Sequence, residues 1–437
     1  MGDLDHLNIQ LSSDERDILQ GSQGPVMQKV MHTVVEFGEA LGADRLVDID
    51  GPGHFVIPWC VAGIAPPIEM LEELVAAGLK TKFPFTLDPR PPLDFENLNL
   101  APDLEAAILE MFSEQERYDE LMLQLGLRDK EAYSCNPYQP EIGNIPDRGA
   151  ILAWSESACA IYANSVFGAR TNRNGAIMDL LLNILGKTPM AGQLTDEGRR
   201  ANWLVEIKTE RLPNPQLLGA AIGIRVRAGV PYICGLDKFL NPDLDGMTTD
   251  YLQEMGATLA TYSAVNLYHV ENITPEAVDM GMDLLRSEYS TLAIDEQGLE
   301  NLKNSYAVMW DDPKANPEKC YIGCPHLSLR QVNWWVEEIE RGLKSRGAER
   351  LAVETVLCAA PGILDEFQAD VETNQRMLPA GLRFSPTCSE TIFETRLCHG
   401  ASVVTNSNKL RGYTSARFFP DEDLVKILVS GVVEEKN

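Results

Sequence analysis

Positive charge is scarce in this chain. Its 437 residues carry 37 Lys and Arg against 65 Asp and Glu, which gives a formal net charge of −28. Nucleic-acid backbones and anionic membrane surfaces are bound through clustered cations, so we expect neither as a partner. A small anionic substrate remains compatible with the composition if a local group of cations lies within the acidic shell.

Long apolar runs are also missing. A membrane-spanning helix needs about 20 apolar residues, and the best stretch, residues 55–68, is interrupted by three prolines. The N-terminus carries Asp3 and Asp5 where a secretory signal would carry Lys or Arg. We therefore expect a cytoplasmic protein with no membrane association.

The cysteines do not form a disulfide pattern. There are nine, an odd number, scattered over a long chain, whereas disulfide frameworks use even numbers in short secreted domains. In a reducing compartment, unusual cysteines more often indicate metal binding or catalysis. Cys320 and Cys324 form a C-x₃-C pair, but the zinc interpretation is weak because no second pair accompanies it.

Helix and strand patterns alternate along the chain, which favours an α/β fold. A chain of this length is too long for one ordinary core, so two or three lobes are expected. The predicted helices cover residues 26–41, 68–77, 103–127, 150–166, 217–228 and 329–343, and the predicted strands cover residues 45–50, 80–85, 230–234 and 402–405.

Residues 135–175 contain the densest group of chemically useful side chains. Cys135 precedes Pro137 in a stretch rich in Pro and Gly, which predicts a rigid loop. The helix predicted over residues 150–166 is otherwise apolar, and polar groups inside it are costly unless they meet partners or a ligand. These polar groups are Glu156, Ser157, Asn164 and Ser165.

A polar turn follows this helix. It offers two guanidinium groups, a hydroxyl and an amide, a set that suits a carboxylate or a phosphate. The alternative is an ordinary exposed turn. Its residues are Arg170, Thr171, Asn172 and Arg173.

Two histidines lie beside predicted strands. His54 follows the strand over residues 45–50, and loops at the carboxyl ends of strands are where open α/β sheets bind ligands. A surface-turn histidine is the alternative for His54. For His269, a role in the site and a structural role are equally compatible with the sequence.

Three cysteines share a setting beside Pro or Gly: Cys135, Cys324 and Cys388. Three thiolates that converge from separate loops would suit an iron–sulfur cluster with incomplete protein coordination, which is then free to act as a Lewis acid. A further polar turn, residues 406–409, ends in the cation Lys409.

Several segments together resemble the large subunit of aconitase X, a branch of the aconitase superfamily. They are CNPY from residue 135, GNIPDRGAILAWSESACAIYANSVFGARTNR from residue 143, HVENITPE from residue 269, GCPH from residue 323, TC from residue 387 and VVTNSNK from residue 403. The resemblance extends over nearly the whole chain.

The resemblance implies an aconitase-like fold of three α/β lobes around a central iron–sulfur cleft. We expect these lobes at about residues 1–200, 201–300 and 301–437. It further implies a 4Fe–4S or 2Fe–2S cluster held by Cys135, Cys324 and Cys388. Because the small swivelling domain that the family requires is not found in these residues, we expect a separate small subunit that supplies a serine as the base.

Hydro-lyase chemistry on a small hydroxy acid is the activity that the resemblance implies. The cluster would polarise the leaving hydroxyl, and cations would hold the substrate carboxylate. The catalytic residues would be Glu156, Ser157 and Lys409. The substrate-binding residues would be His54, Thr86, Asn164, Ser165, Arg170, Thr171, Asn172, Arg173 and Ser407.

The family has two known substrates, and we expect cis-3-hydroxy-L-proline here, with mevalonate 5-phosphate as the alternative. Three positions depart from the family pattern: Asp88 ends a turn that usually reads TTLN, Pro386 replaces an Asp, and Asn408 replaces a glycine. These departures bear on the substrate more than on the fold. Hypotheses of other classes are a non-catalytic iron–sulfur sensing protein, an iron-free or zinc enzyme, and a purely structural subunit.

Overall fold

The computed structural model describes residues 8–56, 65–369, 377–392 and 400–434. They form a mixed α/β fold, as the sequence pattern predicts. In this part of the chain, no helix is long and apolar enough to cross a membrane. The N-terminal residues in which no signal was expected, and much of the apolar stretch at residues 55–68, lie outside the described ranges.

Two parallel sheets dominate the structure. One has the strand order β7-β6-β5-β8 and the other β11-β10-β9-β12-β13. The first contains β5 (Ala201–Ile207), β6 (Pro231–Cys234), β7 (His269–Val270) and β8 (Leu285–Ile294). The second contains β9 (Lys319–Leu327), β10 (Glu354–Ala359), β11 (Leu382–Ser385), β12 (Val403–Thr405) and β13 (Arg417–Phe418).

Two short strand pairs lie in the N-terminal region. β1 (Leu46–Asp48) pairs antiparallel with β4 (Lys187–Pro189), and β2 (His54–Phe55) pairs parallel with β3 (Thr86–Leu87). The register of the second pair sets His54 opposite Thr86. This pairing fixes two of the predicted substrate-binding residues side by side.

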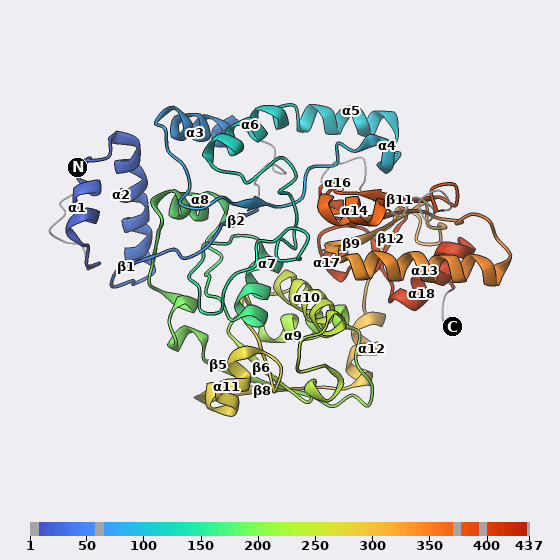
Figure 1. Cartoon of the computed structure of the whole chain (residues 1–437). Coiled ribbons are helices and arrows are strands. Elements are labelled where there is room, and N and C mark those ends of the chain that lie inside the picture. Colours follow the sequence, from blue (N-terminus) through green and yellow to red (C-terminus); the bar gives the residue numbers. More distant parts are fainter. Residues whose placement is uncertain (1–7, 57–64, 370–376, 393–399, 435–437) are drawn as a thin grey trace.

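Helices surround these sheets (Figure 1). In the N-terminal region they are α1 (Ser13–Leu19), α2 (Pro25–Ala40), α3 (Ala65–Ala76), α4 (Phe95–Leu98), α5 (Pro102–Met111), α6 (Gln115–Leu125), α7 (Ser157–Tyr162) and α8 (Ala176–Leu185). The middle region has α9 (Pro215–Val226), α10 (Gly246–Thr261), α11 (Pro275–Met280) and α12 (Glu296–Asn304). The C-terminal region has α13 (Leu329–Arg346), α14 (Pro361–Gln368), α16 (Ser389–Ile392), α17 (Asn408–Tyr413) and α18 (Asp421–Ser430).

Local sequence explains where several helices begin. Ser12 forms a capping box with Glu15 at the start of α1, and Ser328 forms one with Gln331 at the start of α13. Each capping box satisfies backbone N–H groups that have no partner within the helix. Helix α2 begins with Pro25, whose fixed φ suits the first helical position.

Helix α7 lies near the centre of the molecule, between the regions coloured blue to teal, green to yellow and orange to red (Figure 1). It packs against α10, and a π-helical turn at Ala163–Phe167 continues it. One hydrophobic core joins the N-terminal helices to β9 and β10, because Tyr321 and Val356 belong to the same cluster as Leu121. The first and last regions of the chain are therefore packed against each other.

Three predictions of secondary structure need correction. The strand predicted over residues 80–85 is a loop, because its backbone bonds to the ends of helices, as in the bond from Thr81 N–H to the carbonyl oxygen of Leu125 in α6. The strand begins only at Thr86. The single helix over residues 103–127 is two helices, α5 and α6, with a break at residues 112–114. Residues 150–156 are extended because they pair with neighbouring segments, as Leu152 does with Arg170, so α7 begins only at Ser157.

Candidate active site

Cys135 and the Cys324 segment meet although they are far apart in the sequence. The backbone N–H of His326 donates to Cys135 Sγ over 3.0 Å, and Cys324 lies two residues before that histidine. Cys388 follows β11, and its backbone N–H donates to the carbonyl oxygen of Arg90 over 3.0 Å. These contacts tie both C-terminal cysteines to N-terminal loops.

Cys324 lies within β9, not on the loop that the sequence predicts. The pairing of β9 with β10 is irregular there: Ile322 faces Leu357, and Leu327 faces Ala359, so β9 bulges between those pairs. Gly323 permits the bulge, with a φ of +107° and no room for a side chain, since a Cβ would lie 2.2 Å from the Cys358 carbonyl oxygen. The bulge sets the position of Cys324.

The three thiols lie close enough to influence one another electrostatically. Burial raises the pKa of Cys135 and of Cys388, and the neighbouring Cys324 raises both further. Burial also raises the pKa of Cys324 to about 12. Deprotonation of all three therefore requires positive charge at the site, which a metal centre provides.

This donor set fits an iron–sulfur cluster. Such clusters are held by cysteine thiolates, and hydrogen bonds to the sulfurs tune them, as the His326 N–H would at Cys135 Sγ. Among the residues that the structure describes, no group of three or more His, Cys, Asp or Glu side chains, the three cysteines included, is already arranged to hold a metal ion.

A buried ion pair lies beside the cysteines. Lys409 Nζ is 2.9 Å from Glu156 Oε1, and the side chains are only 8% and 4% exposed. Glu156 is the N-cap of α7 and accepts the backbone N–H of Cys159 over 2.6 Å. Lys409 lies in the first turn of α17 and not on a free polar turn, which corrects the prediction from the sequence, because Ser407 caps a helix there.

Both members of this pair are held in their charged forms. Burial alone would raise the pKa of Glu156, but Lys409 and the N–H groups of Ala158 and Cys159 outweigh it and lower the pKa to about 2. Burial alone would lower the pKa of Lys409, but Glu156 and Cys324 outweigh it and raise that pKa. The site thus contains a fixed ammonium group within electrostatic range of a cysteine.

Two predicted serines adjoin this pair. Ser157 Oγ donates to Glu156 Oε1 over 3.2 Å, and its side chain is half-buried. Ser407 Oγ accepts the backbone N–H of Leu410 over 3.0 Å and donates to the carbonyl oxygen of Cys324. Ser407 therefore links the start of α17, which carries Lys409, to the cysteine bulge.

His54 is buried, so the surface-turn alternative is wrong. Its Nδ1 lies 2.9 Å from Thr86 Oγ1, and its Nε2 lies 3.9 Å from Asp88 Oδ1. Burial lowers the pKa of His54 to about 4, against an opposing effect of Glu156, so the ring is neutral near pH 7. The effect of Glu156 on this pKa shows that His54 lies within electrostatic range of the ion pair.

Two predicted binding residues, Asn164 and Ser165, have their polar side-chain atoms bonded within the protein. Asn164 donates to the carbonyl oxygens of Thr171 and Asn266, and its Oδ1 accepts the Thr171 N–H. Ser165 Oγ accepts the backbone N–H of Tyr268 over 2.9 Å. These are the partners that buried polar groups in an apolar helix require, and they favour a structural role.

Arg170 of the polar turn lines a different cavity. Arg170 donates to the Leu194 carbonyl oxygen over 2.7 Å and to Asp196 over 2.6 Å, and Asn172 donates to the Ala191 carbonyl oxygen. This cavity has a volume of about 380 Å³ and is lined by arginines and acids in balance. Its charged residues are Arg148, Arg170, Asp196, Glu197, Arg199, Arg200, Glu276 and Asp279. Arg173 is half-buried with a φ of +55°.

The other histidine considered, His269, is placed as expected of a structural residue. It is buried, and its Nε2 lies 2.9 Å from the carbonyl oxygen of Arg199.

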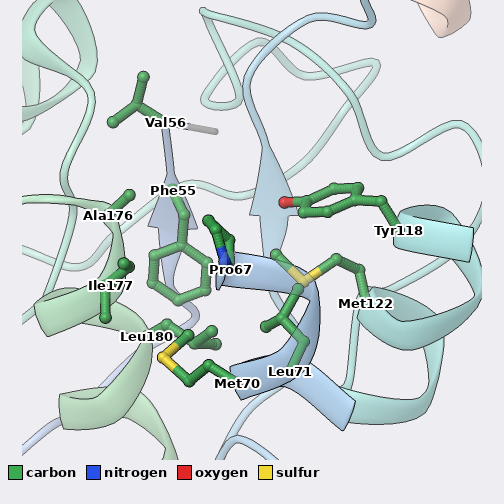
Figure 2. A pocket seen from close by; sticks show the side chains of 10 residues that line it. All are labelled: Phe55, Val56, Pro67, Met70, Leu71, Tyr118, Met122, Ala176, Ile177 and Leu180. Atoms are coloured by element: carbon green, nitrogen blue, oxygen red, sulfur yellow. The ribbon is translucent and has the colours of Figure 1, made fainter. Parts of the chain in front are cut away.

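An apolar pocket beside Phe55 is lined by ten side chains, of which Tyr118 alone shows an oxygen (Figure 2). Its volume of about 20 Å³ is far below that of a ligand pocket, which is usually at least about 300 Å³.

Three residues at the candidate site were not predicted to act there. Asp88 raises the pKa of Cys135, Glu390 raises that of Cys388, and His326 donates its backbone N–H to Cys135. The sequence offers weak signals for them: Asp88 lies two residues after Thr86, and the other two each lie two residues after a predicted cysteine ligand. Distance along the chain alone could not show that their side chains turn toward the centre.

Two family models match the chain. The model "Aconitase X first domain" matches residues 8–197, and "Aconitase X second domain" matches residues 201–304. A crystal structure of aconitase X from Thermococcus kodakaraensis in its holo-form superposes with a TM-score of 0.78 at 28% identity, and the match covers 96% of this chain and 99% of that one.

Curated relatives carry two different names. The phosphomevalonate dehydratase large subunit of Thermococcus kodakarensis is 33% identical over 77% of this chain and 78% of its own length. The protein of that name from Methanocaldococcus jannaschii is 30% identical over 74% and 76%. The cis-3-hydroxy-L-proline dehydratase of Pseudomonas aeruginosa is 27% identical over 74% of this chain but only 52% of its own length.

Proposed function

The chain belongs to the aconitase X family and is a hydro-lyase of the aconitase superfamily, and from this premise we propose that it dehydrates cis-3-hydroxy-L-proline together with a separate small subunit. The observation that carries the assignment to a catalytic centre is the buried pair of Glu156 and Lys409 beside three converging cysteines. The alternative of a non-catalytic sensing protein finds no support in these relatives, which are named as dehydratases.

A separate small subunit is supported by the names of the relatives. Two relatives that are 33% and 30% identical to this chain are named as large subunits, which implies a small subunit partner for those proteins. We propose that the small subunit completes the site and supplies the base, and that the enzyme is cytoplasmic.

Cys135, Cys324 and Cys388 would hold the iron–sulfur cluster. When bound, such a cluster with an open iron position supplies Lewis-acid assistance to a leaving hydroxyl. The three-lobed arrangement around this centre, with boundaries near residues 200 and 300, is part of the same proposal.

The chain's own residues bind and orient the substrate. The Lys409 ammonium is held charged in a buried setting, where it can hold a substrate carboxylate more strongly than an exposed cation could. Glu156 fixes the ammonium in place through one carboxylate oxygen, Oε1, which also accepts the Ser157 hydroxyl. Ser157 is only half-buried, so its hydroxyl is available to reorient toward a substrate.

The charge of the site supports the substrate choice. Burial raises the pKa of Asp88 and of Glu390, and Glu156 raises both further against the opposing effect of Lys409, so the site already disfavours negative charge. Mevalonate 5-phosphate would add a phosphate dianion and a carboxylate. A hydroxy amino acid brings an ammonium group, which favours the ionised carboxylates.

Mevalonate 5-phosphate remains the second candidate, because relatives 33% and 30% identical carry the name phosphomevalonate dehydratase large subunit. The small subunit could supply the missing cations. Arg170 already bonds to Asp196. We therefore propose an anion-binding role for Arg170, Thr171 and Arg173 only if the substrate is mevalonate 5-phosphate.

The test is co-expression with the small subunit under anaerobic conditions, followed by assays of both substrates. We expect the disappearance of cis-3-hydroxy-L-proline, followed by chromatography, to require both subunits. Turnover of mevalonate 5-phosphate alone would reassign the substrate. A complex that contains iron and sulfide but turns over neither compound would overturn the proposal.

A further inference from the structure

Two buried polar atoms face each other across a short gap near the candidate site. His54 Nε2 and Asp88 Oδ1 are 3.9 Å apart, which is too far for a direct hydrogen bond. Both atoms are buried, and neither has a hydrogen-bond partner among the described residues. Buried polar atoms in folded proteins nearly always form a hydrogen bond. Two such atoms without one therefore indicate that a ligand supplies the missing hydrogen bonds.

The hydrogen bonds around His54 allow its ring proton to lie on Nε2. Asn144 Nδ2 donates to Thr86 Oγ1 over 2.8 Å, and the hydroxyl hydrogen of Thr86 can be donated in turn. His54 Nδ1, 2.9 Å from that oxygen, is placed to accept it. In this arrangement the neutral ring carries its hydrogen on Nε2, so a donor at His54 and an acceptor at Asp88 lie side by side.

Asp88 lacks a cation of its own within the described part of the chain. Lys409 approaches closely enough to affect the pKa of Asp88, but its ammonium is bonded to Glu156. The side chain of Asp88 is 18% exposed, so it reaches open space. A carboxyl that is partly accessible, unpaired and set beside a donor is arranged to receive a ligand.

We propose that Asp88 is a specificity-determining residue that accepts a hydrogen bond from the ring ammonium of a hydroxy amino acid, while His54 Nε2–H donates to an oxygen next to it. This inference rests on the proposed function and names the substrate group that its site recognises. A proline-type head group carries an N–H donor and carboxylate acceptors on adjoining atoms, which matches the paired acceptor and donor.

A structural role for this pair is the competing explanation. A structural carboxylate in a buried setting is normally bonded to an Arg, a Lys or a backbone N–H, as Asp250 is to Arg330 and Ser328. The Asp88 side chain has no such bond among the described residues, and only its backbone N–H is engaged, with Phe55. Nothing in the fold therefore requires a carboxyl at this position.

The first experiment compares two ligands on the unaltered complex. L-Proline and cyclopentanecarboxylate share the ring and the carboxylate but differ in the nitrogen. Calorimetric titration of the cluster-loaded two-subunit complex should show proline binding about 10- to 100-fold more tightly, as expected for one charge-assisted hydrogen bond. Equal affinities would overturn the inference without any variant.

The second experiment changes only the carboxyl. Asp88→Asn should raise KM for cis-3-hydroxy-L-proline about 10- to 100-fold and abolish the preference for proline over cyclopentanecarboxylate. Glu254→Gln is the matched control, because Glu254 accepts a hydrogen bond from Gln331 elsewhere in the fold and an amide oxygen can keep it. Cluster absorbance and circular dichroism show that both variants are folded.

The outcomes separate the inference from the proposed function. If the unaltered complex turns over cis-3-hydroxy-L-proline and Asp88→Asn leaves both KM and the ligand preference unchanged, the inference is wrong and the function stands. If the unaltered complex neither binds proline nor turns over cis-3-hydroxy-L-proline, both fall together. Unchanged values for Glu254→Gln, with the loss confined to Asp88→Asn, support the inference.

Discussion

Lys409 forms a buried ion pair with Glu156 at 2.9 Å, although 253 residues separate them in the chain. The pair joins the start of α17 to the start of α7, and each residue keeps the other charged. Buried pairs of this kind contribute little net stability, but breaking one by removing a partner is strongly destabilising. The catalytic role that we propose for Glu156 and Lys409 would account for such a pair beside three thiols.

Removal of the Lys409 ammonium group should therefore lower both the activity and the free energy of unfolding, and a second substitution should separate the two effects. Lys409→Met should lower activity about 100- to 10,000-fold and the free energy of unfolding by about 3–5 kcal/mol. The double variant Glu156→Gln with Lys409→Met should recover most of the stability, since no buried charge is left unpaired, yet none of the activity. Kinetics and chemical denaturation check this, and activity restored in the double variant would rule out a catalytic role.

Cysteine substitutions should distinguish ligands from packed thiols. Cys135→Ala should abolish the visible absorbance and lower the iron content of anaerobically purified protein, because one thiolate ligand is lost. Cys320→Ala is the control: Cys320 is equally buried, in β9, but is not a proposed ligand. Loss of iron from both variants, or from neither, would remove Cys135 from the ligand set.

The glycine of the β9 bulge gives a third test. Gly323→Ala should lower the free energy of unfolding by more than about 3 kcal/mol and disturb cluster binding, because its Cβ would clash with the Cys358 carbonyl oxygen. Gly347→Ala, at the end of α13, has a similar positive φ but nothing within 4 Å of a new Cβ. It should cost only about 1–2 kcal/mol. Equal effects of the two substitutions would contradict the proposed crowding.

Stability should also fall as the pH rises toward neutrality. Burial raises the pKa of Asp179 from its ordinary value of 3.8 to about 7, although Asn174 opposes the shift with two hydrogen bonds. Between those values the unfolded chain has lost the proton while the folded protein keeps it. The contribution of Asp179 is therefore intact below pH 4 and lost progressively up to pH 7.

Denaturation curves at pH 5 and pH 8 measure this loss. The free energy of unfolding should be about 2–3 kcal/mol lower at pH 8 through Asp179 alone. Asp179→Asn should reduce the difference between the two pH values by that amount. An unchanged difference would assign the pH dependence to other groups, such as Asp421, whose pKa burial raises to about 6.

The sequence predicted much of the fold because local signals and packing agree. The helix predicted over residues 26–41 is α2, which begins at Pro25 and ends at Ala40. The prediction was wrong for residues 150–156, whose apolar character suits a helix equally well. Pairing of Leu152 with Arg170, and of Trp154 with His54, keeps this segment extended, and such contacts between distant segments leave no local signature.

The residues of the candidate site were likewise predicted only in part. Residue type alone identified Cys135, Glu156 and Lys409 as candidates, and the structure brings Glu156 and Lys409 into direct contact. Arg170 was included for its charge, but its guanidinium group is bonded to Asp196 and Leu194 and lines another cavity. Which groups an arginine side chain bonds to depends on the fold, and the residues next to it in the sequence do not show this.

The bond from His326 N–H to Cys135 Sγ has a consequence for biosynthesis. During translation, Cys135 leaves the ribosome long before Cys324, Cys388 and Lys409 are made. Its thiol is therefore formed before the other residues of the candidate site exist. With Cys135, Cys324 and Cys388 as the proposed ligands, complete iron loading would follow only after nearly the entire polypeptide has been released. A truncated product that ends before residue 388 should accumulate without iron, whatever the cellular supply.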